Sequence, residues 1–150
     1  MTSNTRLLVK KVVIGGCGRT GVVLASTLCE SGSPVQVLDS NPSAFDRLPP
    51  DLVSSGRVQP RLADVTLASS LRIARAQDAD VFISVTGSDS VNATAAQIAH
   101  HILRVPTVIC RTDDPVKRGM YETLDITAVS QADLIRDMVI RIVSDGGTGQ

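Results

Sequence analysis

The chain has 150 residues, 43% of them hydrophobic and only 2% aromatic, and its 15 Lys and Arg residues balance 15 Asp and Glu residues. This length and composition suit one domain with an aliphatic core, and the zero net charge and scarce aromatic rings argue against nucleic-acid or anionic-membrane binding. No apolar run approaches the ~20 residues of a membrane span, and the polar start lacks the pattern of a signal peptide. Three scattered cysteines without a C-x-x-C pair argue against disulfides and a structural metal site. We therefore expect a cytoplasmic protein that does not insert into a membrane.

The predicted elements begin with a short buried strand over Val12–Ile14, preceded by a flexible lead-in at residues 1–7. The strand leads into a glycine turn and a helix, and the turn fits G-x-G-x-x-G, the dinucleotide-binding fingerprint. Gly16 permits a sharp turn, Gly18 lets a pyrophosphate approach the backbone, and Gly21 lets the helix pack closely on the sheet. The helix N-terminus supplies free N–H groups and partial positive charge for phosphate.

A second strand over residues 34–38 ends at Asp39, 18 residues after the last glycine of the fingerprint. An acidic residue about 20 residues from the glycines is typical of a carboxylate that binds both ribose hydroxyls. Such a carboxylate would repel a 2′-phosphate, so NADP is disfavoured. Asn41 and Pro42 then predict the N-cap and first residue of a short helix, which the pair Pro49-Pro50 would end.

Strands and helices continue to alternate through residue 143. Pro60 lies inside the third predicted strand, which places that strand at a sheet edge. The alternation predicts the α/β class, with a Rossmann-like, doubly wound and mostly parallel six-stranded sheet in the order 3-2-1-4-5-6 and helices on both faces. One domain is expected over residues 8–143, followed by a flexible tail or linker start at 144–150. The later predicted segments are strands over 57–62, 80–85, 105–110 and 126–129 and helices over 67–76, 88–102, 113–121 and 130–143.

Five short motifs follow the predicted strands: GCGRTG at 16–21, LDSNP at 38–42, ADVT at 63–66, VTGSDSVN at 85–92 and CRTDDP at 110–115. Together they are more specific than the glycines, and they resemble the RCK domain family. This family, also called KTN or TrkA-N, is the cytoplasmic nucleotide-sensing module of bacterial potassium channels and Trk/Ktr transporters. The resemblance covers residues 11–143. It implies a homodimer or larger ring whose shape responds to an adenine nucleotide (NAD(H), ATP, ADP or AMP) beneath a membrane-embedded potassium channel or transporter.

The resemblance also implies roles for individual residues. The glycine turn would hold phosphate, and Arg19 would neutralise it. Asp39 would bind the adenosine ribose, Asp64 and its neighbours would border the adenine, and Thr86 would line the far side of the cleft. Arg111 would reach phosphate, in the same protomer or across a dimer. No catalytic residue or metal ligand is expected, and the predicted cofactor-binding residues are Gly16, Cys17, Gly18, Arg19, Thr20, Gly21, Asp39, Ser40, Ala63, Asp64, Val65, Thr86 and Arg111.

Several of these residues have a second interpretation. A cation at a helix N-terminus is unfavourable against the macrodipole, so a bound anion explains Arg19 better than a solvated surface position. Asp64 could instead cap the following helix, and Arg111 could pair with a neighbouring aspartate. Cys17 could be a redox sensor, because a helix N-terminus lowers a thiol pKa, but a space-filling role is favoured. The apolar stripe of the last helix indicates core packing and leaves room for a dimer seam: Leu134, Ile135, Met138, Val139, Ile142 and Val143.

A nucleotide-binding fold does not by itself define a function. An oxidoreductase needs an acid or base near the hydride site, and the dehydrogenase pattern Tyr-x-x-x-Lys is missing because Asp125 lies four residues after Tyr121, the single tyrosine. We therefore predict a regulatory module rather than an enzyme, peripheral to the inner membrane through a transport partner. The alternatives are an NAD-dependent oxidoreductase and a redox- or nucleotide-responsive adaptor for a soluble partner.

Overall fold

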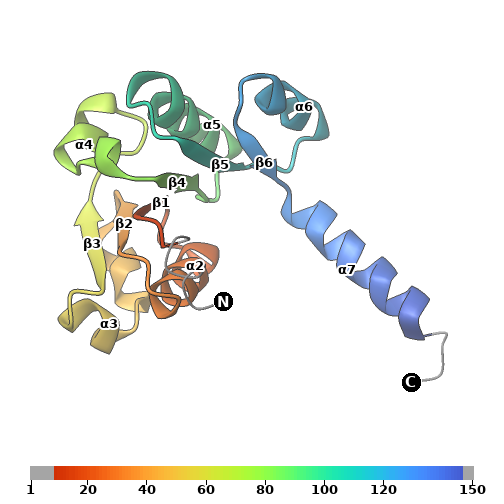
Figure 1. Ribbon diagram of the computed structural model, residues 1–150, viewed down its shortest axis with the longest axis horizontal. Coiled ribbons are helices and arrows are strands. Elements are labelled where there is room, and N and C mark those ends of the chain that lie inside the picture. Colours follow the sequence, from red (N-terminus) through yellow and green to blue (C-terminus); the bar gives the residue numbers. More distant parts are fainter. Residues whose placement is uncertain (1–8, 147–150) are drawn as a thin grey trace.

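The computed structural model describes residues 9–146 (Figure 1). The predicted lead-in at residues 1–7 and the last four residues of the chain lie outside the described residues. The described chain forms a six-stranded sheet in the order β3-β2-β1-β4-β5-β6, and every strand pair is parallel, which confirms the predicted fold. The strands are β1 (Val12–Gly15), β2 (Val35–Asp39), β3 (Val58–Leu62), β4 (Val81–Ser84), β5 (Thr107–Arg111) and β6 (Thr127–Val129).

Helices cover both faces of this sheet, as predicted. They are α2 (Arg19–Glu30), the 3-10 helix η1 (Pro42–Arg47), α3 (Pro50–Ser54), α4 (Ala68–Ile73), the 3-10 turn η2 (Ala76–Asp78), α5 (Asp89–Gln97), the π turn η3 (Ile98–Ile102), α6 (Pro115–Thr123) and α7 (Gln131–Gly146). In Figure 1, α4, α5 and α6 lie above the sheet, and α2 and α3 lie below it.

The central strand β1 is buried on both faces, which explains its run of β-branched residues. Val13 packs with Phe82 in the core on the side of α4, α5 and α6, whereas Val12 and Ile14 pack in the core against α2. At the edge of the sheet, Pro60 in β3 lies opposite Val37 in β2, so the predicted edge position is confirmed. The two cores hold β1 rigidly, and the glycine turn starts from its carboxyl end.

Several helix starts follow the predicted capping residues. Ser88 Oγ accepts a hydrogen bond from the Val91 N–H (3.3 Å), and Asn41 Oδ1 accepts one from the Ser43 N–H (3.2 Å). The expected end of the short helix before the paired prolines is confirmed, because η1 ends at Arg47, but the sequence did not predict that a further helix, α3, begins at Pro50. Proline is tolerated there, since the N–H it lacks has no partner within the helix.

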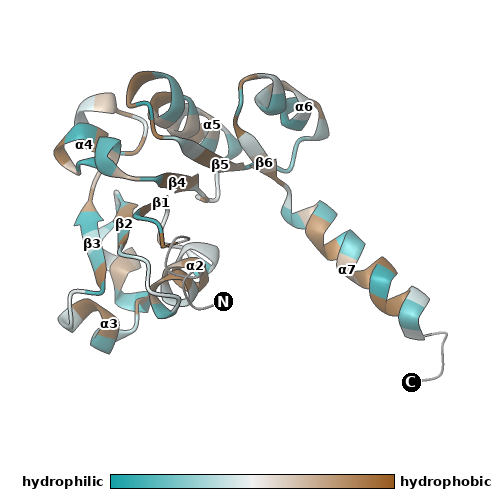
Figure 2. Cartoon of the chain, in the orientation of Figure 1, coloured by the Kyte–Doolittle hydropathy of each residue, from teal (hydrophilic) through white to brown (hydrophobic). Residues whose placement is uncertain are grey.

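The last helix, α7, extends away from the sheet (Figures 1 and 2). The prediction that its apolar stripe packs in the core is wrong, because no residue of α7 is buried. The helix also continues through residues 144–146, where a tail is predicted. Among residues 9–146, no helix is both long enough and apolar enough to cross a membrane. The exposed apolar side chains of α7 are Leu134, Ile135, Met138, Val139, Ile140, Ile142 and Val143.

Because α7 extends away from the sheet, it leaves part of the sheet face beside α2 uncovered. Over β4, β5 and β6 this face forms an open cavity of about 370 Å³, which we call the apolar groove. The start of α7 is fixed at its rim, since Asp133 forms an ion pair with Arg118 of α6 and its N–H donates to Ser130 Oγ (3.2 Å). The groove is lined by Thr20, Leu24, Ile83, Val85, Ile109, Arg111, Val129, Gln131 and Leu134.

Candidate functional site

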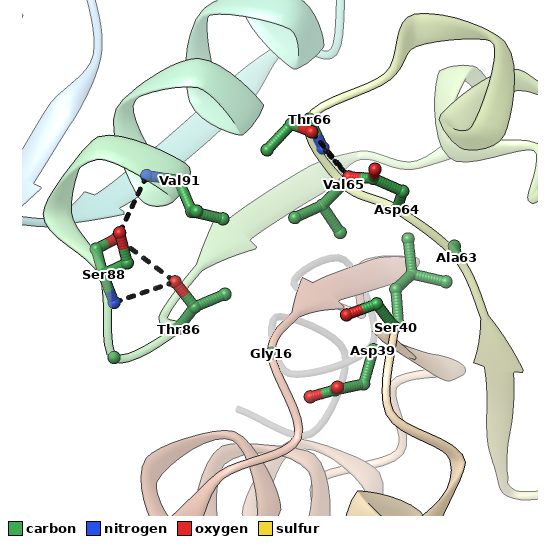
Figure 3. Close-up of a pocket in the computed structure, with 12 residues that line it drawn as sticks. Gly16, Asp39, Ser40, Ala63, Asp64, Val65, Thr66, Thr86, Ser88 and Val91 are labelled. Carbon is green, nitrogen blue, oxygen red and sulfur yellow. Dashed lines mark hydrogen bonds between the residues drawn. The ribbon is translucent and has the colours of Figure 1, made fainter.

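A cleft of about 520 Å³ opens where β1, β2, β3 and β4 end (Figure 3). The carboxyl ends of parallel strands share one edge of the sheet, and ligands bind where the strand order reverses, here on either side of β1. In Figure 3, Thr86, Ser88 and Val91 line one side, facing the loops after β2 and β3. We call this cleft the main arm, and its lining residues are Gly16, Leu38, Asp39, Ser40, Ala63, Asp64, Val65, Thr66, Thr86, Gly87, Ser88 and Val91.

A second cavity of about 270 Å³ adjoins the main arm. We call it the turn arm, because the glycine turn forms one of its walls. The two arms share Gly16, Asp39, Thr86 and Gly87, so a ligand longer than either arm can extend across Asp39. The remaining residues of the turn arm are Cys17, Gly18, Asn41, Ser43, Ala44, Arg47 and Val85.

The three fingerprint glycines are needed for different reasons. Gly16 has a φ of +120°, and a Cβ there would lie 3.0 Å from the Thr86 nitrogen. A Cβ at Gly21 would collide with the Gly16 carbonyl oxygen, so only glycine lets α2 start this close to β1. Among residues 9–146, no atom lies within 4 Å of a Cβ built at Gly18. Protein packing therefore explains Gly16 and Gly21, whereas Gly18 keeps open the space beside the backbone in the turn arm.

The Asp39 carboxylate lies at the junction of the two arms. One of its oxygens accepts a hydrogen bond from the Cys17 N–H, and the other accepts one from the Asn41 N–H, both at 2.9 Å. A carboxylate has about four lone-pair positions, so Asp39 retains acceptors for the two hydroxyls of a ribose. The same side chain thus fixes the glycine turn against the segment after β2 and faces the cleft.

Cys17 is fully buried beneath the turn arm, and its Sγ donates to the Ala44 carbonyl oxygen (3.4 Å). Burial, with a further contribution from the nearby Asp39 carboxylate, raises the pKa of the Cys17 thiol to about 11. The lowering expected from the helix N-terminus is wrong, because burial and this negative charge outweigh it. The thiol is protonated at neutral pH and lacks the thiolate that redox chemistry requires.

Asp64 lies in the loop after β3 and lines the main arm. Its Oδ1 accepts hydrogen bonds from the Thr66 N–H (2.9 Å) and the Thr66 hydroxyl (2.6 Å), and these bonds lower the pKa of the Asp64 carboxyl. The interpretation of Asp64 as a helix cap is wrong, because the N-cap of α4 is Leu67 and no side chain caps that helix. Its contact with adenine stays a prediction.

Thr86 is held in place by the buried side chain of Asn92. Asn92 Oδ1 accepts hydrogen bonds from the Thr86 N–H (2.7 Å) and hydroxyl (2.6 Å). Asn92 Nδ2 donates to the carbonyl oxygens of Thr86 (3.0 Å) and Arg111 (3.2 Å). One amide therefore connects the loops after β4 and β5, so the wall of the main arm depends on a residue outside the cleft.

The cleft contains most of the predicted site residues. Ser40 and Asp64 are exposed, whereas Ala63 and Val65 are buried and form an apolar part of the wall. The predicted residues that line the main arm are Gly16, Asp39, Ser40, Ala63, Asp64, Val65 and Thr86, and those that line only the turn arm are Cys17 and Gly18.

Four predicted site residues line neither arm. Arg19 and Thr20 are exposed on the first turn of α2, and Gly21 is buried behind the turn. Arg111 lies in the apolar groove and forms an ion pair with Asp113 (Nη2 to Oδ2, 3.6 Å), so its pairing with a neighbouring aspartate is confirmed. Contacts of Arg19 and Arg111 with phosphate stay predictions.

Sequence reasoning also missed residues of the cleft. The most consequential is Arg47 in the turn arm, which no motif indicated because it lies eight residues after Asp39, in a segment without regular periodicity. The others lie near the carboxyl ends of strands, either in the last residues of the strand or in the segment that follows it, a signal that the carboxyl-edge rule for parallel sheets supplies. They are Leu38, Thr66, Gly87, Ser88 and Val91 in the main arm and Asn41, Ser43, Ala44 and Val85 in the turn arm.

The TrkA-N domain family model matches residues 12–132. The chain belongs to the TrkA-N domain family. Among curated relatives, the Trk system potassium uptake protein TrkA of Streptomyces coelicolor is 32% identical over 137 residues, which cover 91% of this chain and 59% of that protein. This TrkA-N domain thus spans about three fifths of the length of that relative.

Solved structures share the fold of this TrkA-N domain. The Kef CTD of Shewanella denitrificans, in AMP-bound form, has a TM-score of 0.73 at 19% identity and covers 93% of this chain and 82% of that chain. The GsuK RCK domain has a TM-score of 0.74 at 20% identity and covers 92% of this chain and 29% of that chain. GsuK also matches in structures bound to ADP and to NAD.

Proposed function

We propose that this TrkA-N domain binds an adenine nucleotide and regulates a potassium channel or transporter. The observation that carries the proposal is the cleft at the switch point of the sheet, with Asp39 between the main arm and the glycine turn. The open space at Gly18 supports it, because no packing contact within the described part of the chain requires a glycine there. AMP in the Kef domain and ADP and NAD in GsuK, which share the fold, favour an adenine nucleotide.

The two arms suggest how the nucleotide is oriented. The ribose hydroxyls would donate to the Asp39 carboxylate, and the adenine would occupy the main arm beside Val65 and Val91. The phosphates would then enter the turn arm, where Gly18 precedes the N-terminus of α2. Free N–H groups and partial positive charge at that end favour an anion.

The proposal is tested on freshly purified protein. Nucleotides released by denaturation are identified by mass spectrometry, and AMP, ADP, ATP, NAD and NADH are titrated calorimetrically into nucleotide-free protein. We expect Asp39→Asn to abolish binding while the thermal melting curve confirms folding, because asparagine retains one oxygen acceptor for the turn. Asp51→Asn, at an exposed position on α3, is the charge-matched control. Flat titrations with wild-type protein would overturn the nucleotide role.

We propose regulation rather than catalysis. Tyr121 is buried in the core on the side of α5 and α6, and neither histidine lines either arm. The cleft therefore lacks a tyrosine or histidine that could act as acid or base in hydride transfer. We expect no steady turnover of NADH, followed at 340 nm, with a panel of carbonyl substrates. Sustained, substrate-dependent oxidation would favour the oxidoreductase alternative.

The proposed partner is a membrane-embedded potassium channel or transporter, which would place the domain at the cytoplasmic face of the inner membrane. The relationship to the TrkA of Streptomyces coelicolor supports this assignment. Affinity purification from detergent-solubilised membranes is expected to retain a potassium transport subunit. Recovery of a soluble regulatory protein instead would favour the adaptor alternative.

The proposed assembly is a homodimer, or a ring built from dimers. The exposed apolar face of α7 and the apolar groove lie on the same chain, so a second copy can place its α7 over the groove of the first and receive the same contact in return. Such reciprocal contacts are typical of two-fold symmetric dimers.

A further inference from the structure

The turn arm contains a cation that the sequence motifs do not indicate. Arg47 is the last residue of η1 and lines this arm with Cys17 and Gly18. Arg19, the cation that the motifs assign to phosphate, lines neither arm. Within residues 9–146, no carboxylate forms an ion pair with Arg47. None of the carboxylates in this part of the chain therefore neutralises its charge through an ion pair.

The backbone that carries Arg47 is fixed against the glycine turn. Asp39 bridges the two segments by accepting the Cys17 N–H with one oxygen and the Asn41 N–H with the other. The Cys17 thiol adds a second link, to the Ala44 carbonyl oxygen. The start of η1 is closed by Asn41 Oδ1, which accepts from the Ser43 N–H and hydroxyl. The start of η1 is thus joined to the turn, and Arg47 lies exposed at the end of this same short helix.

The charges around the turn arm favour an anion at the end nearer Arg47. The Arg47 guanidinium and the Asp39 carboxylate act in opposite directions on the pKa of the Cys17 thiol, so both charges are felt at the turn. A phosphate in this arm would be repelled by Asp39 and attracted by Arg47. A guanidinium offers several N–H donors in a plane, which suits the oxygens of a phosphate group.

We propose that Arg47 binds the second phosphate of the nucleotide and makes the site selective for diphosphates over AMP, a role that rests on the proposed nucleotide site. With the ribose at Asp39, the first phosphate lies at the glycine turn beside Gly18. A second phosphate continues into the turn arm, toward Arg47. The favoured ligand class is therefore an adenine nucleotide with at least two phosphates, such as ADP, ATP or NAD(H).

The test compares ADP with AMP by calorimetric titration, at fixed ionic strength and without magnesium. Arg47→Gln is expected to weaken ADP binding by roughly 10-fold to 100-fold, the range for a lost hydrogen bond to a charged group. AMP affinity should change less than about twofold, since AMP lacks the second phosphate. Arg47→Lys should recover part of the ADP affinity by restoring the charge. Arg72→Gln, at an exposed position on α4, removes the same charge elsewhere and should change neither affinity.

The outcomes separate this proposal from the nucleotide site itself. If wild-type protein binds neither ligand, both proposals fail. If wild-type protein binds ADP but Arg47→Gln leaves its affinity unchanged, or weakens AMP and ADP equally, only the role of Arg47 is overturned. If Arg19→Gln loses the preference for ADP over AMP and Arg47→Gln keeps it, the second phosphate is bound by Arg19. This result would also overturn the role of Arg47.

Discussion

At the scale of single residues, Gly18 and Gly21 belong to one turn but should respond differently to the same added methyl group. Gly18→Ala places its Cβ in open space, so we expect normal stability and a nucleotide affinity lowered about tenfold or more. Gly21→Ala forces a collision with the Gly16 carbonyl, and overpacking of this kind costs about 1–3 kcal/mol. Urea unfolding and calorimetric titration measure both quantities on the two variants. Equal destabilisation of both variants would contradict the assignment of Gly18 to the ligand.

The raised pKa of the Cys17 thiol predicts how the free energy of unfolding changes at alkaline pH. Its raised pKa means that the folded protein holds the thiol proton after the unfolded chain has lost it. The contribution of the Cys17 thiol to the free energy of unfolding is therefore fully present below about pH 9. As the pH rises from about 9 to about 11, the free energy of unfolding falls by about 2 kcal/mol. The free energy of unfolding of Cys17→Ala should thus fall less steeply over this range than that of wild type. Parallel slopes for the two proteins would show that the thiol does not titrate as described.

At the scale of elements, Asn92 connects the loops after β4 and β5. Asn92→Ala removes the acceptor for the Thr86 N–H and leaves two carbonyl oxygens without their donor. We expect a loss of about 2–3 kcal/mol in the free energy of unfolding, because buried polar groups lose their partners. Thr94→Ala, at an exposed position on the same helix, should change stability by less than about 0.5 kcal/mol. A similar small change in Asn92→Ala would mean that the two loops are held by other contacts.

The elements also show which features the sequence could predict. β1, the glycine turn and α2 were predictable because glycine geometry and a β-branched run leave few conformations. Asp39 was found from its spacing, but its hydrogen bonds to the turn depend on how two loops meet in space. Arg47 was missed for the same reason. For α7, helical periodicity indicates an apolar face but not what covers it, so the core-packing prediction failed.

At the scale of the whole molecule, the apolar face of α7 and the apolar groove predict that two copies of the chain form a dimer. Burial of each large apolar side chain contributes roughly 1.5–3 kcal/mol, so a few such contacts from each copy favour a dimer. Met138→Asp on α7 should place a charge in this contact, and Thr20→Asp should do so at the rim of the groove. Each is expected to raise the dimer dissociation constant at least about tenfold in sedimentation equilibrium. Because the contact is apolar, added salt should not dissociate the wild-type dimer.

The control for this prediction is Ile73→Asp, which introduces the same charge at an exposed apolar position on α4, away from both surfaces. It should leave the dissociation constant unchanged. Two variants on opposite sides of the contact are needed because Met138→Asp alone could act on α7 without involving the groove. If Met138→Asp dissociates the dimer and Thr20→Asp does not, α7 helices pair with each other and leave the groove open. If wild-type protein is monomeric at every concentration, neither surface joins two copies, and the exposed face of α7 must be covered by a different chain.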